Sequence, residues 1–224
     1  MRLTKLGAVC QIIMGQSPPS TTYNNKSQGL PFFQGKTDFS EKYPSVRVWC
    51  DSPKKIAEKG DILMSVRAPV GPVNIADQPC AVGRGICAIR PSKEVITDYL
   101  FYVLRSKEQE IAARGLGSTF QAINKDAVAS IEIPLASLSE QQRIVSKLER
   151  ADKLKHLRQQ SIEEDKKYLL SLFFEISGNK TYPHEPISKH VLKTETVDPR
   201  KKPKEIFKYV DIAGIDSHQG VIKE

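Results

Sequence analysis

The first part of the chain alternates short apolar runs with turn residues. Each run is bounded by Gly, Pro, Asp or Asn, which is typical of short β-strands joined by tight turns. The expected strands cover residues 6–14, 31–33, 62–66, 73–76, 86–89 and 131–134. Several strands with few helices over residues 1–138 predict one α+β domain, built on a twisted, mostly antiparallel sheet.

Two helical segments interrupt this pattern. The first is expected to be capped by Thr97 or Asp98 and to end before Gly115. Its inner face would carry Leu100, Phe101, Leu104, Glu108 and Ile111. Asn124 is expected to cap a second, shorter turn of helix.

Residues 139–176 differ from the preceding segment because they contain neither Pro nor Gly to interrupt a helix. They predict a single coiled-coil-type helix about 57 Å long, and Ser139-Glu-Gln-Gln142 has the spacing of a capping box at its start. A stripe at three-four spacing is apolar at both ends and polar in the middle. Its apolar members are Ile144, Leu148, Ala151, Ile162, Leu169, Leu172 and Ile176, and its polar members are Lys155, Arg158 and Asp165. Such a helix needs a partner helix, from this chain or another, to cover the stripe. The alternative is a helix that lies along its own domain.

Residues 177–224 follow the helix and begin with the breaker Ser177-Gly-Asn179. They include a charged turn at Asp198-Pro-Arg-Lys-Lys-Pro203 and an alternating strand pattern at residues 207–212. The segment is too short to bury an independent core. We interpret it as a linker followed by the incomplete start of a second domain.

Composition narrows the class of protein. The chain is 39% hydrophobic and 27% charged, with a formal net charge of +8, and most of this excess falls in residues 1–138. A basic folded domain is compatible with binding a polyanion such as nucleic acid. We expect a cytoplasmic protein, because no apolar run is long enough for a membrane span or for a signal peptide.

The residues needed for several kinds of chemistry are missing. Four cysteines at positions 10, 50, 80 and 87 lack the spacing of a metal site and are expected to be free thiols in a reducing compartment. We find no Walker loop for ATP and no Asn/Asp-Pro-Pro-aromatic motif for methyl transfer to a flipped base. Glu164-Asp-Lys166 has a nuclease-like local pattern but lies on the long helix, where charges are expected on a solvated face. The sequence therefore predicts a non-catalytic binding and scaffolding protein without metal or cofactor. The alternatives are a small stand-alone enzyme that cleaves or modifies DNA, and a scaffold or inert remnant that reads no DNA.

Five strings occur in a fixed order along residues 1–176. They are Pro31-Phe-Phe-Gln-Gly-Lys-Thr-Asp-Phe39, Lys59-Gly-Asp-Ile-Leu-Met-Ser-Val-Arg-Ala-Pro-Val-Gly71, Val82-Gly-Arg-Gly85, Gly117-Ser-Thr-Phe-Gln-Ala-Ile-Asn124 and Ile133-Pro-Leu-Ala-Ser-Leu-Ser-Glu-Gln-Gln-Arg-Ile-Val145. Together they resemble the DNA-specificity subunit of type I restriction-modification systems. In that family a target-recognition domain is followed by a long helix, and the pair is repeated.

The resemblance implies a function. Two recognition domains would read the halves of a split site in double-stranded DNA, with the helices as spacer and as dock for methyltransferase subunits and, through them, the restriction subunit. Residues 186–222 are similar to the start of a second recognition domain, but the rest of that domain and the second helix are absent from this chain. A homodimer paired through residues 139–176 would restore both.

The matched strings suggest residues that contact DNA. Lys36, Arg67 and Arg84 are cations beside glycines or in Pro/Gly-bounded turns, where a side chain can meet phosphates or a guanine edge. Donors suited to phosphates or bases are supplied by Ser118, Thr119, Gln121, Asn124 and Lys125. The alternatives are that Gly83-Arg-Gly85 is only a strained turn and that Arg67 pairs with Asp61 or Asp77.

Overall fold

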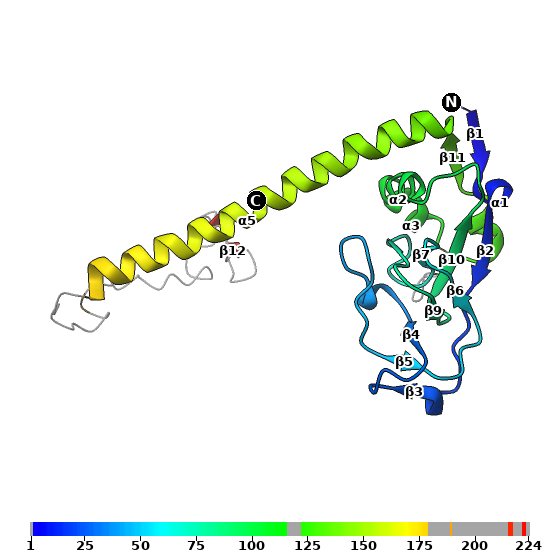
Figure 1. The fold of residues 1–224 in the computed structure, drawn as a ribbon, viewed down its shortest axis with the longest axis horizontal. Coiled ribbons are helices and arrows are strands. Elements are labelled where there is room, and N and C mark those ends of the chain that lie inside the picture. Colours follow the sequence, from blue (N-terminus) through cyan, green and yellow to red (C-terminus); the bar gives the residue numbers. More distant parts are fainter. Residues whose placement is uncertain (1, 116–121, 179–188, 190–214, 217–220, 223–224) are drawn as a thin grey trace, which may run out of the picture. The chain divides into compact units, whose positions relative to one another are not determined.

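The computed structural model describes residues 2–115, 122–178, 189, 215–216 and 221–222 (Figure 1). The chain falls into two compact units, residues 1–164 and 165–224. The first unit contains three sheets and most of the helices, and the long helix α5 runs from the first unit into the second.

A four-stranded antiparallel sheet forms the centre of the first unit. Its strands, in spatial order, are β2 (Cys10–Met14), β10 (Ile86–Pro91), β7 (Ile62–Ser65) and β8 (Val73–Ile75). Strand β7 is buried along its whole length, which explains why its sequence is apolar without alternation. Successive side chains nevertheless point to opposite faces, because Ile62 and Met64 belong to one core and Leu63 to another.

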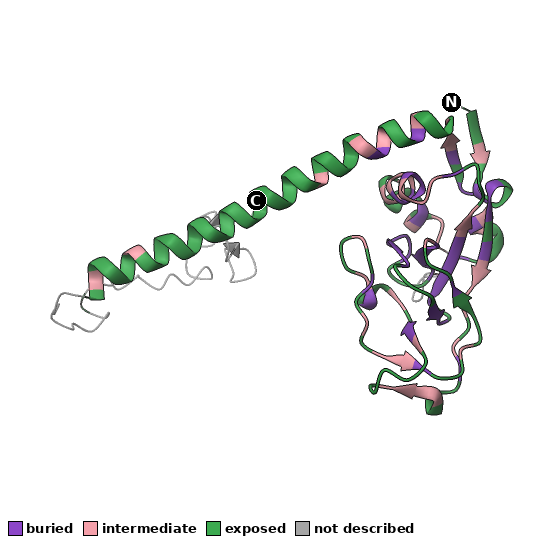
Figure 2. Ribbon diagram, viewed as in Figure 1, coloured by how far each residue is buried: buried purple, intermediate pink, exposed green. Residues whose placement is uncertain are grey.

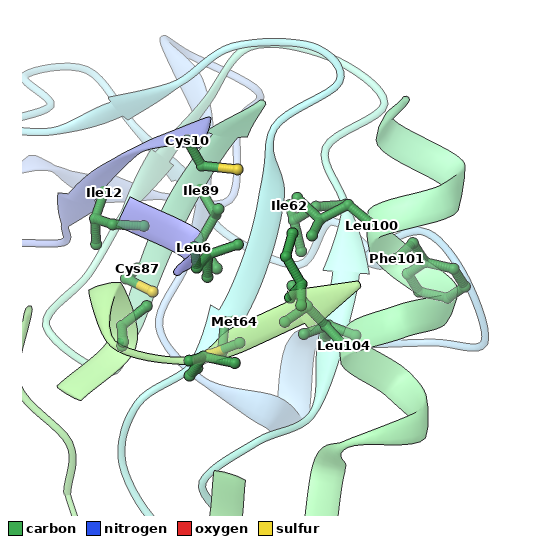
Figure 3. Packing of buried hydrophobic residues seen from close by; sticks show 14 of the residues in the cluster. Leu6, Cys10, Ile12, Ile62, Met64, Cys87, Ile89, Leu100, Phe101 and Leu104 are labelled. Atoms are coloured by element: carbon green, nitrogen blue, oxygen red, sulfur yellow. The ribbon is translucent and has the colours of Figure 1, made fainter. Parts of the chain in front are cut away.

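One face of this sheet packs on helices. Helix α2 (Thr97–Ser106) lies against β7 and β8, and its Leu100, Phe101 and Leu104 meet Ile62 and Met64 in the larger core (Figure 3). The other face meets Phe33, Ala57, Cys80 and Val82 of a second, five-stranded sheet. The strand order of that sheet is β3 (Tyr23–Asn24), β5 (Trp49–Cys50), β4 (Leu30–Phe33), β9 (Cys80–Val82) and β6 (Ile56–Ala57). The central sheet is therefore buried on both sides.

The remaining elements of the first unit are short. A two-stranded sheet pairs β1 (Arg2–Lys5) with β11 (Glu132–Leu135) in antiparallel register. The short helices are α1 (Leu6–Val9), α3 (Glu108–Ala113), α4 (Lys125–Ala129) and two 3-10 turns, η1 (Ser20–Thr22) and η2 (Lys36–Asp38). Among the described strands, β4 and β9 form the one parallel pair. The predicted α+β class with a mostly antiparallel sheet is confirmed.

Three sequence-based expectations about element boundaries were wrong. The run 6–14 is not one strand. Its first four residues, Leu6–Val9, form a helical turn that connects β1 to β2 along the chain, and Leu6 and Val9 are buried. The helix after position 96 is not capped by Thr97 or Asp98, which are its first residues. The Thr97 hydroxyl donates instead to the Gly60 carbonyl, and the Asp98 carboxylate pairs with Lys42. This helix also breaks at Lys107, although Ile111 beyond the break is buried as predicted.

The long helix α5 (Leu138–Gly178) confirms the helical prediction for residues 139–176. Its first turn is stabilised by Ser137, whose hydroxyl accepts from the Glu140 backbone N–H at 3.4 Å. Ser139, the predicted cap, already lies inside the helix. The capping residue is thus two positions earlier than expected.

Only the first turns of α5 pack on the first unit. Gln141 and Val145 are buried, and Ile144, Leu148 and Ala151 line an apolar hollow of about 480 Å³ against α2. From Lys153 to Leu170 every residue is exposed (Figure 2). The predicted stripe residues Ile162, Leu169 and Ile176 are exposed, and Leu172 is half-buried. Within the first unit, the prediction of a helix that lies along its own domain therefore fits α5 only as far as Asp152.

Gln141 fastens α5 to the first unit. The side chain is fully buried and makes three hydrogen bonds: its Oε1 accepts from the Ile96 backbone N–H at 2.8 Å, and its Nε2 donates to the carbonyls of Glu94 and Ala136 at 2.9 Å each. Ile96 is the residue at the cap position of α2, which has no side-chain cap of its own. The side chain of Gln141 therefore accepts a hydrogen bond from the backbone N–H at the start of α2, where the helix has no side-chain cap of its own.

A second contact on the surface adds to this anchor. Lys42 pairs with Asp98 of α2 at 2.9 Å and with Glu149 of α5 at 3.3 Å. One turn further along α5, the Asp152 carboxylate accepts from the Tyr102 hydroxyl at 2.9 Å. Burial and the neighbouring Asp152 charge raise the pKa of Tyr102 to about 12, so its hydroxyl keeps its proton and remains a donor. The start of α5 is consequently tied to α2 at several points.

The second unit is described only in part. Beyond α5 it contains the antiparallel pair β12 (Ile215–Asp216) and β13 (Val221–Ile222). The strand predicted at 207–212 and the charged turn at 198–203 lie outside the described residues. In the part of the chain that the structure describes, no helix is both long enough and apolar enough to cross a membrane.

All four cysteines are buried and free. Burial raises the pKa of Cys10, Cys80 and Cys87 to about 12, from an ordinary 9.0. We expect the native protein to react slowly with a thiol reagent such as DTNB at about pH 8 and to expose all four thiols in guanidinium chloride. Because the three pKa values are raised in the folded state, their stabilising contribution is complete below about pH 9 and is lost as the pH rises towards 12. Rapid reaction of native thiols at pH 8 would contradict this prediction.

Candidate nucleic-acid interface

Three cations from separate parts of the sequence lie around one hollow. Lys36, Arg67 and Arg84 line a concavity of about 320 Å³, which we call the cationic hollow. The other lining residues are Ser17, Gln34, Gly35, Thr37, Ser65, Ala68, Pro69 and Gly85. All three cations are exposed, and among the described residues none of them makes a hydrogen bond or ion pair through its side chain. The hollow is lined by no carboxylate, so its charge is uncompensated.

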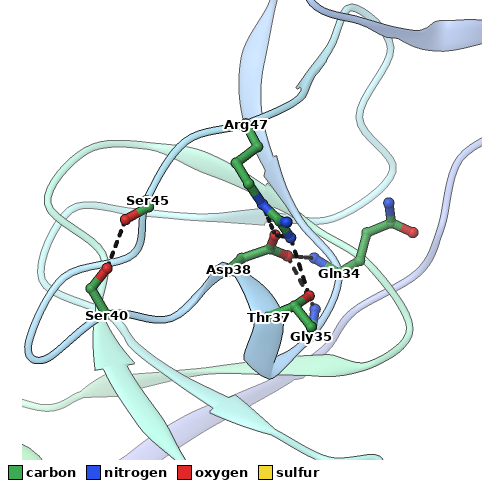
Figure 4. Close-up of polar contacts among 7 residues, drawn as sticks. All are labelled: Gln34, Gly35, Thr37, Asp38, Ser40, Ser45 and Arg47. Carbon is green, nitrogen blue, oxygen red and sulfur yellow. Dashed lines mark hydrogen bonds and ion pairs between the residues drawn. The ribbon is translucent and has the colours of Figure 1, made fainter. Parts of the chain in front are cut away.

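The loop that carries Lys36 is organised by one buried carboxylate. One oxygen of Asp38 accepts from the backbone N–H groups of Gln34 and Gly35, at 2.7 and 3.3 Å (Figure 4). The other oxygen accepts from the guanidinium of Arg47, which also donates to the Thr37 hydroxyl at 3.2 Å. A charged partner makes these hydrogen bonds stronger than neutral ones. The backbone around Lys36 is therefore fixed before any ligand binds.

Arg84 lies at the tip of a tight turn. The Ile86 N–H donates to the Gly83 carbonyl at 3.0 Å, and the Arg84 N–H donates to the Ser17 hydroxyl at 3.2 Å. A Cβ on Gly85 would lie 2.1 Å from the Gln34 carbonyl oxygen, so only glycine fits there. Neither Gly83 nor Gly85 has left-handed backbone, so the turn carries no left-handed strain, and the packing against Gln34 is what requires Gly85. The glycine brings the Arg84 turn against the Lys36 loop.

Arg67 lies two residues after the end of β7. The Ser65 hydroxyl donates to the carbonyls of Arg67 and Pro69, at 3.0 and 2.8 Å, and holds this turn. The predicted alternative partner Asp61 is instead paired with Arg90 at 2.9 Å, and Asp77 makes no ion pair with Arg67. Arg67 is therefore presented to solvent.

The other predicted residues have mixed outcomes. Ser118, Thr119 and Gln121 lie outside the described residues. The side-chain Oδ1 of Asn124 accepts from the Ala127 backbone N–H at 2.8 Å, so its predicted capping role is confirmed. Neither Asn124 nor Lys125 lines the cationic hollow, although both are exposed. Their neighbour Ala122 forms a β-bridge with Arg67, which places the described end of that segment beside the hollow.

Sequence reasoning missed several residues of this site. Ser17, Gln34 and Thr37 line the hollow, and Asp38 with Arg47 holds its loop. Gln34, Thr37 and Asp38 lie in the same string as Lys36, residues 31–39, so their closeness in sequence to Lys36 could have indicated that they belong to the site. Arg47 gave none, because its contact with Asp38 depends on the fold of the intervening loop.

The arrangement is suited to binding anions. Exposed, unpaired Lys and Arg side chains on a fixed backbone bind phosphate oxygens, and Arg can also bind a guanine edge. In the described ranges, no three His, Cys, Asp or Glu side chains gather as metal ligands would.

Comparison with known proteins identifies the family. The profile described as "Type I restriction modification DNA specificity domain" matches residues 2–164, most of the chain. The chain belongs to this family. The matched range ends at Glu164, which is also where the first compact unit ends.

Individual relatives agree with this assignment. The chain is 42% identical over 166 residues to the "Putative type I restriction enzyme MjaX specificity subunit" of Methanocaldococcus jannaschii, covering 72% of this chain and 39% of that protein. It resembles the HsdS subunit from Thermoanaerobacter tengcongensis with a TM-score of 0.64 at 44% identity, covering 71% of this chain and 39% of that one. A second structure, from work on complex assembly and conformational transition of the type I R-M system, gives a TM-score of 0.70 at 44% identity and covers 76% of this chain and 43% of that one. The chain thus spans less than half the length of these relatives.

Proposed function

We propose that this chain is a DNA-reading subunit of a type I restriction-modification complex and has no catalytic activity of its own. It binds double-stranded DNA with the first unit and directs methyltransferase and restriction subunits to a split site in the cytoplasm. The observation that carries the proposal is the cationic hollow, where three unpaired cations meet without a carboxylate in a domain of the specificity family. Residues 1–138 would be the recognition domain, 139–176 the spacer, and 177–224 a linker with the start of a second recognition domain.

The cations of the hollow are expected to bind phosphates. Lys36→Ala, Arg67→Ala and Arg84→Ala should each weaken binding across all duplex sequences and reduce the slope of log affinity against log salt by about one. Fluorescence anisotropy with labelled duplexes at several salt concentrations measures both quantities.

A matched control is available on the same domain. Lys93 is an exposed lysine just beyond the end of β10, whereas the Arg84 turn precedes the start of that strand. Lys93→Ala should leave affinity and salt slope near those of the parent chain. An affinity that ignores salt, or an equal loss with Lys93→Ala, would contradict phosphate binding at the hollow. If Arg84 instead reads a guanine, its loss relaxes preference at one base position.

The long helix would supply the partner surface. Exposed apolar side chains follow α5 beyond its anchor: Leu154, Leu157, Ile162, Leu169, Phe173, Phe174 and Ile176. Exposed apolar area costs about 25 cal/mol per Å² relative to burial, so such a surface favours a partner. We propose that it pairs with a second copy of the chain and contacts methyltransferase subunits. In a two-fold dimer, the two recognition domains must read the same half-site in inverted orientation.

A further inference from the structure

A second hollow adjoins the cationic one. It has a volume of about 690 Å³ and shares Gln34 with the cationic hollow. Four of its lining residues carry amide side chains, Asn24, Asn25, Gln28 and Gln34, and we call it the amide hollow. The rest of its lining is Thr21, Tyr23, Lys26, Val48 and Asp51.

The two hollows differ in charge. The cationic hollow has three cations and no carboxylate, whereas the amide hollow balances Lys26 against Asp51. A hollow with balanced charge lacks the uncompensated cations that dominate phosphate binding. Neutral groups that both donate and accept suit the edges of bases, which present donors and acceptors side by side. The side chains of the amide hollow are therefore suited to hydrogen bonds with base edges, and those of the cationic hollow are suited to binding DNA phosphates.

The four amides themselves fall into two kinds. Asn24 is used within its own loop: its Oδ1 accepts from the backbone N–H groups of Lys26 and Gln28 at 3.1 Å each, and its Nδ2 donates to the Gln28 carbonyl at 2.9 Å. The side-chain amides of Asn25, Gln28 and Gln34 are exposed and make no hydrogen bond with any described residue. Figure 4 shows the Gln34 amide directed away from the Asp38 carboxylate. Three amides are thus free to bind.

The loop that presents these amides is held in place. Gly29 has φ = 84°, and a Cβ there would lie 2.1 Å from the Cys50 carbonyl oxygen, so glycine allows the loop to pack against β5. Tyr23 at the start of the loop donates to the Pro18 carbonyl at 2.9 Å and packs on Phe32 with ring centroids 4.7 Å apart. A loop fixed before binding costs less ordering entropy when its side chains meet a ligand.

We infer that the amide hollow reads base edges in the major groove while the cationic hollow holds the adjacent phosphates. An asparagine or glutamine amide pairs bidentately with adenine, donating to N7 and accepting from the N6 amino group. At least one position of the recognised site is then an adenine read by Asn25, Gln28 or Gln34. This inference rests on the proposed function, because it requires the chain to bind duplex DNA.

The test is to select preferred sites from a randomised duplex pool with the full chain, purified alone and together with its methyltransferase subunit. Asn25→Ala, Gln28→Ala and Gln34→Ala are compared with Gln109→Ala, which removes an exposed amide from α3, an element that does not line the hollow. At least one hollow variant should lose about 5- to 150-fold preference at one base position, with an unchanged salt slope. Gln109→Ala should keep the parent preference.

A change of specificity gives a sharper result than a loss. If Gln28 reads an adenine, Gln28→Glu should shift the preference at that position from adenine towards cytosine, because a carboxylate accepts from the cytosine N4 amino group but cannot donate to N7. The same substitution at Asn25 or Gln34, to Asp or Glu, makes the equivalent test at those positions. A new preference also shows that the variant folds.

The outcomes separate the two proposals. If the parent chain selects a site and all hollow variants select the same site equally well, the inference is overturned and DNA reading by the chain stands. If the variants instead weaken binding equally for all sequences and change the preference at no position, the hollow binds the DNA backbone and the inference is again overturned. If the parent chain selects no site in either preparation, the proposed function itself fails.

Discussion

Replacing Gln141 by leucine is expected to lower the free energy of unfolding of the first unit by about 3 kcal/mol. The change removes three part-buried hydrogen bonds made by a fully buried side chain, and it leaves the Ile96 N–H and the carbonyls of Glu94 and Ala136 without their partner. Each buried polar group left unsatisfied costs about 1–3 kcal/mol, and the added apolar contact of leucine offsets part of that sum. Urea unfolding followed by the fluorescence of Trp49, the single tryptophan, reports on this unit.

The adjacent glutamine is a matched control. Gln142 is exposed on the same turn of α5, so Gln142→Leu should change the stability by less than about 0.5 kcal/mol. Hydrogen exchange gives an independent measure, since the Ile96 amide should lose protection in Gln141→Leu. Equal stabilities for the two variants would contradict the role of Gln141 as an anchor.

Placing aspartates on the outer part of α5 is expected to convert a dimer into monomers. Ile162 and Leu169 are 49% and 62% exposed and lie on the predicted apolar stripe. In the proposed dimer they are buried against the second copy, where an unpaired carboxylate is strongly unfavourable. Sedimentation equilibrium should show a dimer for the parent chain and a monomer for Ile162→Asp with Leu169→Asp. The monomer should bind a symmetric split site far more weakly, because the two half-sites are no longer engaged together.

A second pair of aspartates separates charge from position. Gln160 and Ser171 are exposed residues on the opposite side of the helix from Ile162 and Leu169 at 100° per residue. Gln160→Asp with Ser171→Asp adds the same negative charge and should remain dimeric. A parent chain that stays monomeric at tens of micromolar, or that prefers a strongly asymmetric site, would refute the homodimer.

Local patterns were sufficient to predict most of the framework. The strands at 62–66 and 86–89 and the helix at 139–176 were found because apolar runs and the absence of Pro and Gly are properties of adjacent residues. The run 6–14 was misread because the helical turn at Leu6 depends on a tertiary hydrogen bond from its N–H to the Ile131 carbonyl. The hydrophobic pattern of residues 6–14 cannot indicate a hydrogen bond to a residue as distant in the sequence as Ile131.

The candidate site shows the same division. Lys36, Arg67 and Arg84 could be selected from the motifs that surround them, but their meeting at one hollow requires three segments to be folded together. The different roles of Asn24 and Asn25 could not be predicted, since they are adjacent residues with the same chemistry. Only the bonds from Asn24 to Lys26 and Gln28 distinguish them. Likewise, Gln141 and Gln142 are identical in sequence terms, and burial alone separates them.

Within residues 24–29, the residues that maintain the loop conformation differ from those whose side chains are free, and this affects how the DNA specificity of the domain can evolve. Asn24 and Gly29 maintain the shape of the loop, whereas the side chains of Asn25 and Gln28 contribute nothing to it. Substitutions at positions 25 and 28 are therefore expected to leave the free energy of unfolding nearly unchanged. Single substitutions there can alter the DNA sequence that is recognised while the protein stays folded. For the same reason, a library randomised at these two positions and constant at Asn24 and Gly29 is a practical starting point for redirecting the domain to a chosen DNA sequence.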